Sequence, residues 1–134
     1  MRCLAGSGAE ILMPEIHWPV HLQQALLAGF RPVFYKLDEH FAPDPESIRR
    51  AAGPATRVLL LNTPANPTGA VSGLPLQQTL YEIADERGWQ IISDEAYEDF
   101  AFSGPTCPSP PWSATAPRRS ASSTASSPSP RGRR

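Results

Sequence analysis

Four side chains in this sequence could together hold a flat, charged heterocycle. They are the indole of Trp18, the amide of Asn66, the carboxylate of Asp94 and the phenol of Tyr97. An indole can cover a ring face, an amide and a phenol can hydrogen-bond a ring oxygen, and a carboxylate can pair with a ring cation. Each residue alone also has an ordinary structural explanation, as a core aromatic, a turn residue, a helix cap or a packing residue. Their importance depends on whether the fold brings them together.

Strands and helices are predicted to alternate along the chain. Runs rich in β-formers predict four strands, at Glu10–Met13, Pro32–Leu37, Arg57–Asn62 and Trp89–Asp94. Apolar residues three and four apart, with caps and stops, predict three helices, at Val20–Gly29, from Pro45 to about Ala52, and at Leu74–Arg87. In the first helix, Leu22, Ala25, Leu26 and Gly29 follow the i, i+3, i+4, i+7 spacing of one apolar helix face, and Gly29 is expected to end the helix. This order predicts an α/β fold of three layers with a mostly parallel sheet and right-handed crossovers.

The alternation also predicts where a ligand would bind. In open α/β sheets, ligands lie beyond the carboxyl ends of the strands. Trp18 follows the first predicted strand and Asn66 follows the third. Asp94 ends the fourth strand and Tyr97 comes shortly after it. We therefore expect the four side chains to converge at one edge of the sheet.

Three segments resemble a known family. The segment Leu59–Gly69 resembles the Asn-Pro-Thr-Gly signature of class I/II aminotransferases, which are fold type I pyridoxal-phosphate enzymes. The segment Ile91–Asp99 resembles their second cofactor segment. Gly8–Pro14, running into Trp18, is similar to the strand and ring-stacking aromatic of the family. The resemblance covers roughly residues 6–104, and its landmarks come in the family's order.

The resemblance implies roles for the four residues. Trp18 would stack on the pyridine ring of pyridoxal 5′-phosphate, and Asn66 and Tyr97 would hydrogen-bond its 3′ oxygen. Asp94 would pair with the pyridine nitrogen and favour its protonated form, which draws electrons from the substrate. The implied reaction moves an amino group between an amino acid and a 2-oxo acid. Two alternatives stay open: a β-lyase of the same fold, which would use the same contacts, and a non-catalytic truncated product.

The catalytic lysine of the family has no counterpart in the sequence. The Schiff-base lysine of the family lies some tens of residues after the Asp/Tyr segment, whereas the one lysine here, Lys36, precedes Asn66. We therefore expect no catalytic residue and negligible turnover from this chain. The resemblance places the phosphate-binding turn before Met1 and the substrate-binding arginine beyond the last residue. The chain is thus expected to be an internal piece of the large domain of a homodimeric parent.

Charge and composition divide the chain at Gly104. Residues 1–104 carry 7 Lys and Arg against 13 Asp and Glu, whereas residues 105–134 carry 5 Arg and no acid. We interpret residues 1–104 as a partial cofactor-binding large domain. Residues 105–134, rich in Pro, Ser and Arg and without Leu, Ile, Val or Phe, predict a disordered tail made by a frameshift or a miscalled gene end. Nucleic-acid binding by the tail is disfavoured, because it has no Lys cluster and one aromatic, Trp112.

Other partners and sites are not predicted. The apolar runs are too short to span a membrane and the N-terminus lacks a secretory signal, so a cytoplasmic protein without a membrane partner is expected. Cys3 and Cys107 form no pair motif, which fits that compartment. His17 and His21 have a spacing that can bind metal on a helix, but no third ligand is evident. We therefore expect no metal site, and assign both histidines to local packing or capping.

Overall fold

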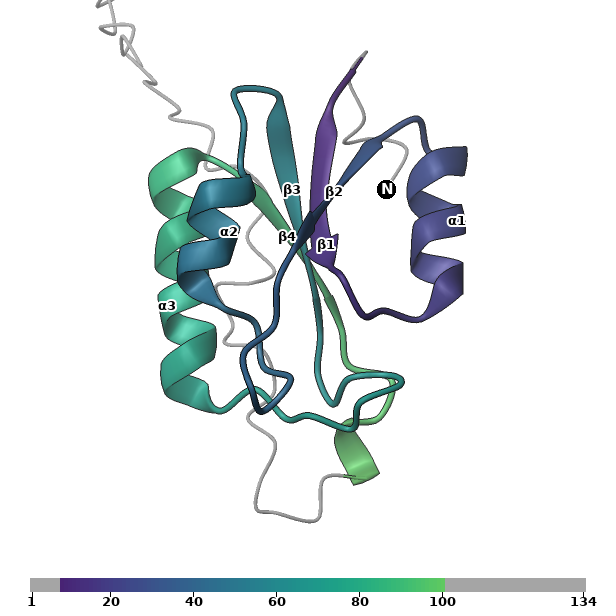
Figure 1. The fold of residues 1–134 in the computed structure, drawn as a ribbon, viewed down its shortest axis with the longest axis vertical. Helices are drawn as coiled ribbons and strands as arrows, with labels where there is room; N and C mark the ends of the chain where they lie inside the picture. Colours follow the sequence, from purple (N-terminus) through teal and green to yellow (C-terminus); the bar gives the residue numbers. More distant parts are fainter. Residues whose placement is uncertain (1–7, 101–134) are drawn as a thin grey trace, which may run out of the picture.

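The computed structural model of the chain describes residues 8–100, so the predicted tail lies outside the described residues. Within this range, strands and helices alternate as the sequence predicts (Figure 1). The elements are β1 Glu10–Pro14, α1 Pro19–Leu27, β2 Arg31–Tyr35, α2 Pro45–Ala51, β3 Thr56–Asn62, α3 Leu74–Arg87, β4 Gln90–Asp94 and a short 3-10 helix, η2, Glu98–Phe100. The predicted α/β class is confirmed.

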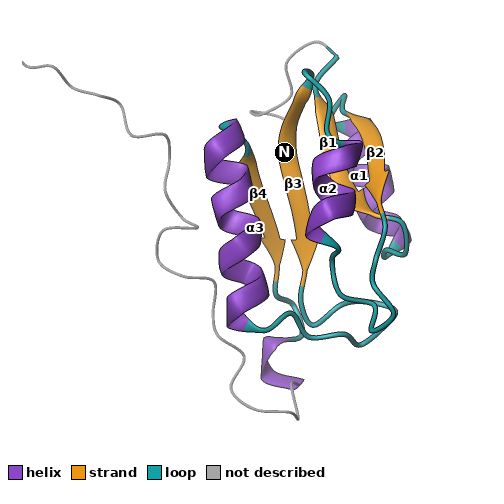
Figure 2. Cartoon of the chain, turned by 60° about the vertical axis from the view of Figure 1, so that its left-hand side comes forward, coloured by secondary structure: helices purple, strands orange, loops and turns teal. Residues whose placement is uncertain are grey.

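The sheet is parallel throughout the described residues, with strand order β2-β1-β3-β4. The chain starts in the interior of the sheet at β1, moves out to β2, and then crosses to β3 and β4 on the other side. Helix α1 covers one face, and α2 and α3 cover the other (Figures 1 and 2). The connections after β1 and β3 therefore leave toward opposite faces. Such a reversal creates a crevice at the carboxyl ends of the two strands, where ligands bind in open α/β folds.

Alternate residues of the central strands separate two apolar clusters. Leu12, Leu59 and Leu61 pack with residues of α2 and α3. Val58 and Leu60 pack on the opposite face with residues of α1. Because successive strand side chains point to opposite faces, Asn62 lies on the α1 face, as does Asp94, two residues after Ile92 of that cluster. The strand pattern therefore directs both polar side chains toward α1.

Helix α1 buries a different stripe from the apolar face that the spacing indicates. His21 and Ala25 are buried, whereas Leu26, on that apolar face, is 56% exposed. Gly29 lies beyond the helix, at a φ of 88°. The reason is the contact between His21 and Asp94, which fixes the rotation of the helix about its axis. The apolar spacing alone did not show that a histidine begins the buried stripe.

Strand β2 ends earlier than predicted, at Tyr35. The N–H of Lys36 donates to the Ser47 hydroxyl at 2.7 Å, and the carbonyl of Lys36 accepts from the N–H of Asp44 at 3.3 Å. These bonds take Lys36 into the connection to α2 rather than into the sheet. Asp44 caps the helix that follows, since its carboxylate accepts from the N–H of Glu46 at 2.9 Å.

Helix α3 has the predicted bounds. Gly88 ends it in the left-handed conformation with φ of 66°, where a side chain would be strained. Its buried side includes Leu80 and Ile83, while Arg87 is exposed and lies 6.0 Å from the centre of the Trp89 ring. None of the helices within residues 8–100 is long and apolar enough to cross a membrane.

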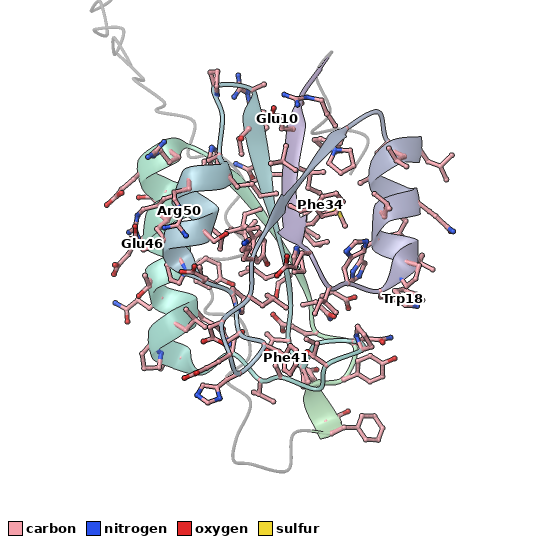
Figure 3. All side chains as sticks on the ribbon, viewed as in Figure 1. Glu10, Trp18, Phe34, Phe41, Glu46 and Arg50 are labelled. Atoms are coloured by element: carbon pink, nitrogen blue, oxygen red, sulfur yellow. The ribbon has the colours of Figure 1, made fainter. Side chains whose placement is uncertain are left out.

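The amino ends of three strands are joined by a buried carboxylate. One oxygen of Glu10 pairs with the guanidinium of Arg31, and the other accepts from the Thr56 hydroxyl at 2.9 Å. The Thr56 hydroxyl oxygen in turn accepts from the N–H of Gly53 at 2.9 Å. A Cβ at Gly53 would lie 3.1 Å from Glu10, so glycine allows this close approach. Figure 3 shows Glu10 at the opposite end of the sheet from Trp18.

Candidate functional site

Trp18 stands where the chain enters α1. It is the N-cap residue, in extended conformation with φ of −65° and ψ of 125°, and Pro19 begins the helix. The preceding turn is tied by His17, whose Nδ1 lies 2.8 Å from the carbonyl oxygen of Pro14. The indole is 40% exposed and meets the ring of His21 edge to face at 5.5 Å. Trp18 therefore presents an aromatic surface at the carboxyl edge of the sheet.

Asp94 ends β4 with its carboxylate directed toward α1. Its Oδ2 lies 2.7 Å from Nε2 of His21, 73 positions earlier in the chain. Its Oδ1 accepts from the N–H of Ala96 at 3.2 Å. The side chain remains 28% exposed. The carboxylate is thus held in place from two sides and still reaches the surface of the edge.

His21 is the site residue that the sequence analysis missed. A carboxylate only accepts hydrogen bonds, so the proton between the two side chains belongs to Nε2 of His21. The other ring nitrogen, Nδ1, is buried and has no hydrogen-bond partner within the described residues. A polar atom left unsatisfied in this way costs about 1–3 kcal/mol and calls for an explanation, such as a ligand site. The available signal was the spacing from Trp18, since residues three apart share one side of a helix.

His17 has a separate role from His21. Besides its bond to Pro14, its ring stacks on Phe34 with centroids 5.5 Å apart. For His17, the assignment to local packing agrees with these contacts. No three metal-binding side chains gather anywhere in the part of the chain that the structure describes.

Asn66 lies in the compact loop between β3 and α3. The loop contains two cis peptide bonds, before Pro64 and Pro67, and Gly69 has a φ of 73°. It closes on itself through Ala65, whose N–H donates to the carbonyl of Ala70 at 2.9 Å and whose carbonyl accepts from Gly69 at 2.7 Å. The loop therefore holds the amide of Asn66 out at the carboxyl edge.

The far end of this loop is fastened to α3. The N–H of Ser72 donates to the Thr63 hydroxyl oxygen at 2.9 Å. The carbonyl of Ser72 accepts from the buried side-chain amide of Gln77 at 2.7 Å. These contacts fix where the loop enters the helix, and none of them reaches Asn66 directly.

Tyr97 comes from the turn that follows β4 and meets Asn66 across the edge. Nδ2 of Asn66 lies 3.5 Å from the Tyr97 hydroxyl, at the outer limit of a hydrogen bond. The phenol is 43% exposed and its ring packs edge-on against Phe100 at 6.5 Å. The Asn66 amide and the Tyr97 hydroxyl can both donate, so together they can hydrogen-bond a single oxygen placed between them.

The structure thus arranges the four predicted residues as two contact groups at one edge of the sheet. Asn66 and Tyr97 form one group, and Trp18 and Asp94 form the other through His21. This set offers an aromatic surface, two donors for one oxygen and a carboxylate for a cation. Lys36, the only lysine of the sequence, is exposed just after β2.

Comparison with known proteins gives a consistent match. The sequence model of the family described as "Aminotransferase class I and II" matches residues 1–125. The match continues past Gly104, where the sequence analysis places the end of the family pattern. Among solved structures, the chain is similar to the aspartate aminotransferase of Thermus thermophilus with maleate, with a TM-score of 0.76 and 32% identity. That similarity covers 80% of this chain and 28% of the other.

Curated relatives show the same partial coverage. The chain is 34% identical over 105 residues to the aspartate aminotransferase of Geobacillus stearothermophilus, which is 77% of this chain and 27% of the relative. It is also 34% identical over 104 residues to a glutamate-pyruvate aminotransferase of Escherichia coli, which is 76% of this chain and 26% of the relative. The chain therefore spans about a quarter of the length of the relatives that it matches.

Proposed function

Because the chain belongs to the class I and II aminotransferase family, we propose that it forms part of a pyridoxal 5′-phosphate site in an enzyme that transfers an amino group between an amino acid and a 2-oxo acid. The relatives named above are aspartate and glutamate-pyruvate aminotransferases, which supports this substrate class. The proposal rests on one observation: Asn66 and Tyr97 contact each other at the edge of the sheet where β4 ends with Asp94.

The side chains at this edge fit the cofactor chemically. Pyridoxal phosphate has a flat ring, a phenolic 3′ oxygen and a basic ring nitrogen, which match an indole, a pair of donors and a carboxylate. When bound, its protonated ring supplies the electron sink that stabilises negative charge on the α-carbon of a substrate.

Each residue has one task in the proposed site. Asp94 pairs with the ring nitrogen and keeps it protonated, because a neighbouring negative charge favours the cationic form. His21 donates to Oδ2 of that carboxylate and fixes its direction. Asn66 and Tyr97 donate to the 3′ oxygen, and Trp18 covers one ring face and excludes water from it.

We further propose that this chain carries no catalytic residue. Proton transfer at the substrate needs a positioned base, and Lys36 belongs to the β2–α2 connection, where its backbone is bound to Ser47 and Asp44. The parent enzyme is proposed to be a cytoplasmic homodimer. Incubation of the 134-residue chain with aspartate and 2-oxoglutarate is expected to give negligible glutamate, and turnover that survives Lys36→Ala would contradict this.

Cofactor binding tests the central proposal. Pyridoxine 5′-phosphate is a suitable probe, because it has the ring, the 3′ oxygen and the phosphate but no aldehyde to react with lysine. In equilibrium dialysis, the chain is expected to retain the probe and Asn66→Ala with Tyr97→Phe to lose most of this retention. Gln77→Met, which changes a buried amide away from the edge, serves as the matched control. Equal retention by all the variants would overturn the assignment of the site.

A further inference from the structure

Asn62 connects the two segments that carry the candidate cofactor contacts. It is the last residue of β3, lies opposite Asp94 in the strand ladder, and is only 9% exposed. Its Oδ1 accepts from the N–H of Asn66 at 2.8 Å. Its Nδ2 donates to the carbonyl of Asp94 at 3.1 Å and lies 3.4 Å from the carbonyl of Pro64. One buried amide thus touches the strand end and the loop at once.

We infer that Asn62 is a positioning residue that couples the loop of Asn66 to the strand end of Asp94. The inference rests on the proposed function for the identity of the ligand. In this role, Asn62 fixes the distance between Asn66, which is proposed to bind the 3′ oxygen, and Asp94, which is proposed to bind the ring nitrogen.

The hydrogen bonds at Asp94 show how the strand side is fixed. Its carbonyl oxygen accepts from the N–H of Thr63 at 3.0 Å as well as from Nδ2 of Asn62. A carbonyl oxygen has two lone pairs, so both are used. The peptide plane that follows Asp94 is therefore held from the β3 side, and the direction of the carboxylate is held with it.

The loop side depends on Asn62 more strongly. The loop's internal bonds join Ala65 to Gly69 and Ala70, and its far end is fastened through Ser72. Within the described residues, the bond from the N–H of Asn66 to Oδ1 of Asn62 ties the backbone of Asn66 to the sheet. Without it, the loop would keep its shape but lose its fixed position relative to Asp94.

The two hydrogen bonds of Asn62 require the chemistry of an amide. Only a side chain with both an acceptor and a donor can serve the Asn66 N–H and the Asp94 carbonyl together. Asn62→Asp keeps the acceptor but sets a carboxylate against two carbonyl oxygens. Asn62→Leu has a similar shape and makes neither bond. The two variants therefore separate the loop contact from the strand contact.

Amide hydrogen exchange on the full chain tests the coupling without any ligand. In Asn62→Leu, the Asn66 N–H is expected to exchange at least about tenfold faster, because it loses its acceptor, while Leu59 and Leu60 keep their rates. In Asn62→Asp, the Asn66 N–H is expected to stay protected. Gln77→Met, which removes a buried amide at the far end of the loop, should leave Asn66 unchanged. Unchanged exchange at Asn66 in Asn62→Leu, or faster exchange at Asn66 in Asn62→Asp or Gln77→Met, would overturn the inference.

A pair of ligands tests the consequence for binding. Pyridoxine 5′-phosphate and its 3-deoxy analogue differ only in the 3′ oxygen, so their affinity ratio, measured in a Tyr97→Phe background that removes the other proposed donor, reports the Asn66 contact. In this background, the full chain is expected to prefer the first by about three- to tenfold, the value of one net hydrogen bond. Asn62→Leu, Asn62→Asp and Asn66→Ala should each bring the ratio near one, and the double variant Asn62→Leu/Asn66→Ala should lose nothing further.

The outcomes separate this inference from the proposed function. A ratio kept by Asn62→Leu or Asn62→Asp but lost by Asn66→Ala would overturn the positioning role while leaving the cofactor site intact. A Tyr97→Phe chain that does not distinguish the ligands would contradict the proposed 3′-oxygen contact of Asn66. In that case, the exchange rate at Asn66 still decides whether Asn62 couples the loop to the strand.

Discussion

The two ends of the sheet treat buried polar groups in opposite ways. At the amino end, both oxygens of Glu10 have partners inside the fold, from Arg31 and Thr56. At the carboxyl end, one buried nitrogen of His21 has no hydrogen-bond partner among residues 8–100, and the carboxylate of Asp94 stays partly exposed. The network at the amino end is satisfied within the chain, whereas the network at the carboxyl end keeps a buried atom without a partner among the described residues.

We interpret this difference as a division of roles between stability at the amino end and ligand binding at the carboxyl end. A fully satisfied polar network rigidifies a fold, whereas an unsatisfied one is costly and persists where it serves another purpose. We therefore expect changes at the amino end to alter the free energy of unfolding, and changes at the carboxyl end to alter ligand affinity.

The largest effect is expected from Glu10→Ala. It removes two hydrogen bonds to a buried carboxylate, and bonds to charged groups contribute about 1.5–3 kcal/mol each, but the exposed Arg31 regains water. The free energy of unfolding in urea should fall by about 2–3 kcal/mol. The affinity of the folded fraction for pyridoxine 5′-phosphate should not change.

Glu46→Ala is the matched control for Glu10→Ala. Glu46 also pairs with an arginine, Arg49 at 2.9 Å, but on an exposed helix surface. Such pairs contribute at most about 1 kcal/mol. If both variants shifted the urea midpoint equally, the satisfied network at the amino end would not be the source of stability that we assign to it.

Asp94→Asn is expected to show the reverse pattern. The amide keeps the shape of the side chain but not the charge that pairs with a ring cation. Affinity for pyridoxine 5′-phosphate, measured by dialysis, should fall by about 10- to 100-fold, the value of one charged hydrogen bond. Asp99→Asn removes an exposed carboxylate five residues later and should leave affinity unchanged. A loss of stability larger than that of Glu10→Ala would show that Asp94 acts mainly by stabilising the fold.

Tyr35 lies near the carboxyl end of the sheet, yet its hydroxyl is satisfied within the fold. The strand ladder between β1 and β3 stops at Leu12, and Pro14 has no N–H to extend it. The Tyr35 hydroxyl donates to the carbonyl of Leu60 at 3.1 Å instead. Tyr35→Phe should therefore cost about 1 kcal/mol of stability at neutral pH and leave ligand affinity unchanged.

The pH dependence of stability distinguishes Tyr35 from other residues. Burial raises the pKa of Tyr35 well above its usual range. Above pH about 10 the unfolded chain loses this proton while the folded chain keeps it, so stability falls as pH rises, by at most about 1.4 kcal/mol per pH unit. Urea unfolding from pH 8 to 11 should show that Tyr35→Phe lacks this part of the decline and that exposed Tyr97→Phe retains it. Identical slopes in wild type and Tyr35→Phe would contradict the assignment.

Local patterns predicted the elements of the fold and the four candidate residues. Continuous apolar runs such as Val58–Leu61 and stops such as Gly88 indicated the alternation, and the carboxyl-end rule then selected Trp18, Asn66 and Asp94. These features are encoded within a few neighbouring positions. The division at Gly104 stays a prediction, because residues 101–134 lie outside the described residues.

The residues that the sequence did not reveal act through distant partners. His21 depends on the rotation of α1 against β4, Asn62 on the register of β3 with β4, and Glu10 on the register of β1 with β2 and β3. The partners on other strands or helices lie between 21 and 73 positions away. Such pairings are set by tertiary packing, which a single sequence does not display.

The smallest effect on stability is expected in the difference between Trp18→Ser and Trp18→Ala. Trp18 occupies the N-cap of α1 without a side-chain cap bond. Both variants lose the indole surface and its edge-to-face contact with His21, but the serine hydroxyl can cap the helix, so Trp18→Ser should be the more stable of the two by about 1 kcal/mol. Ligand affinity should nevertheless fall by about three- to tenfold, because the ring loses its aromatic cover. Trp18→Phe should retain most of that affinity. A strong loss of stability in Trp18→Ser with unchanged affinity would show that the indole stabilises the fold and does not contact the ligand.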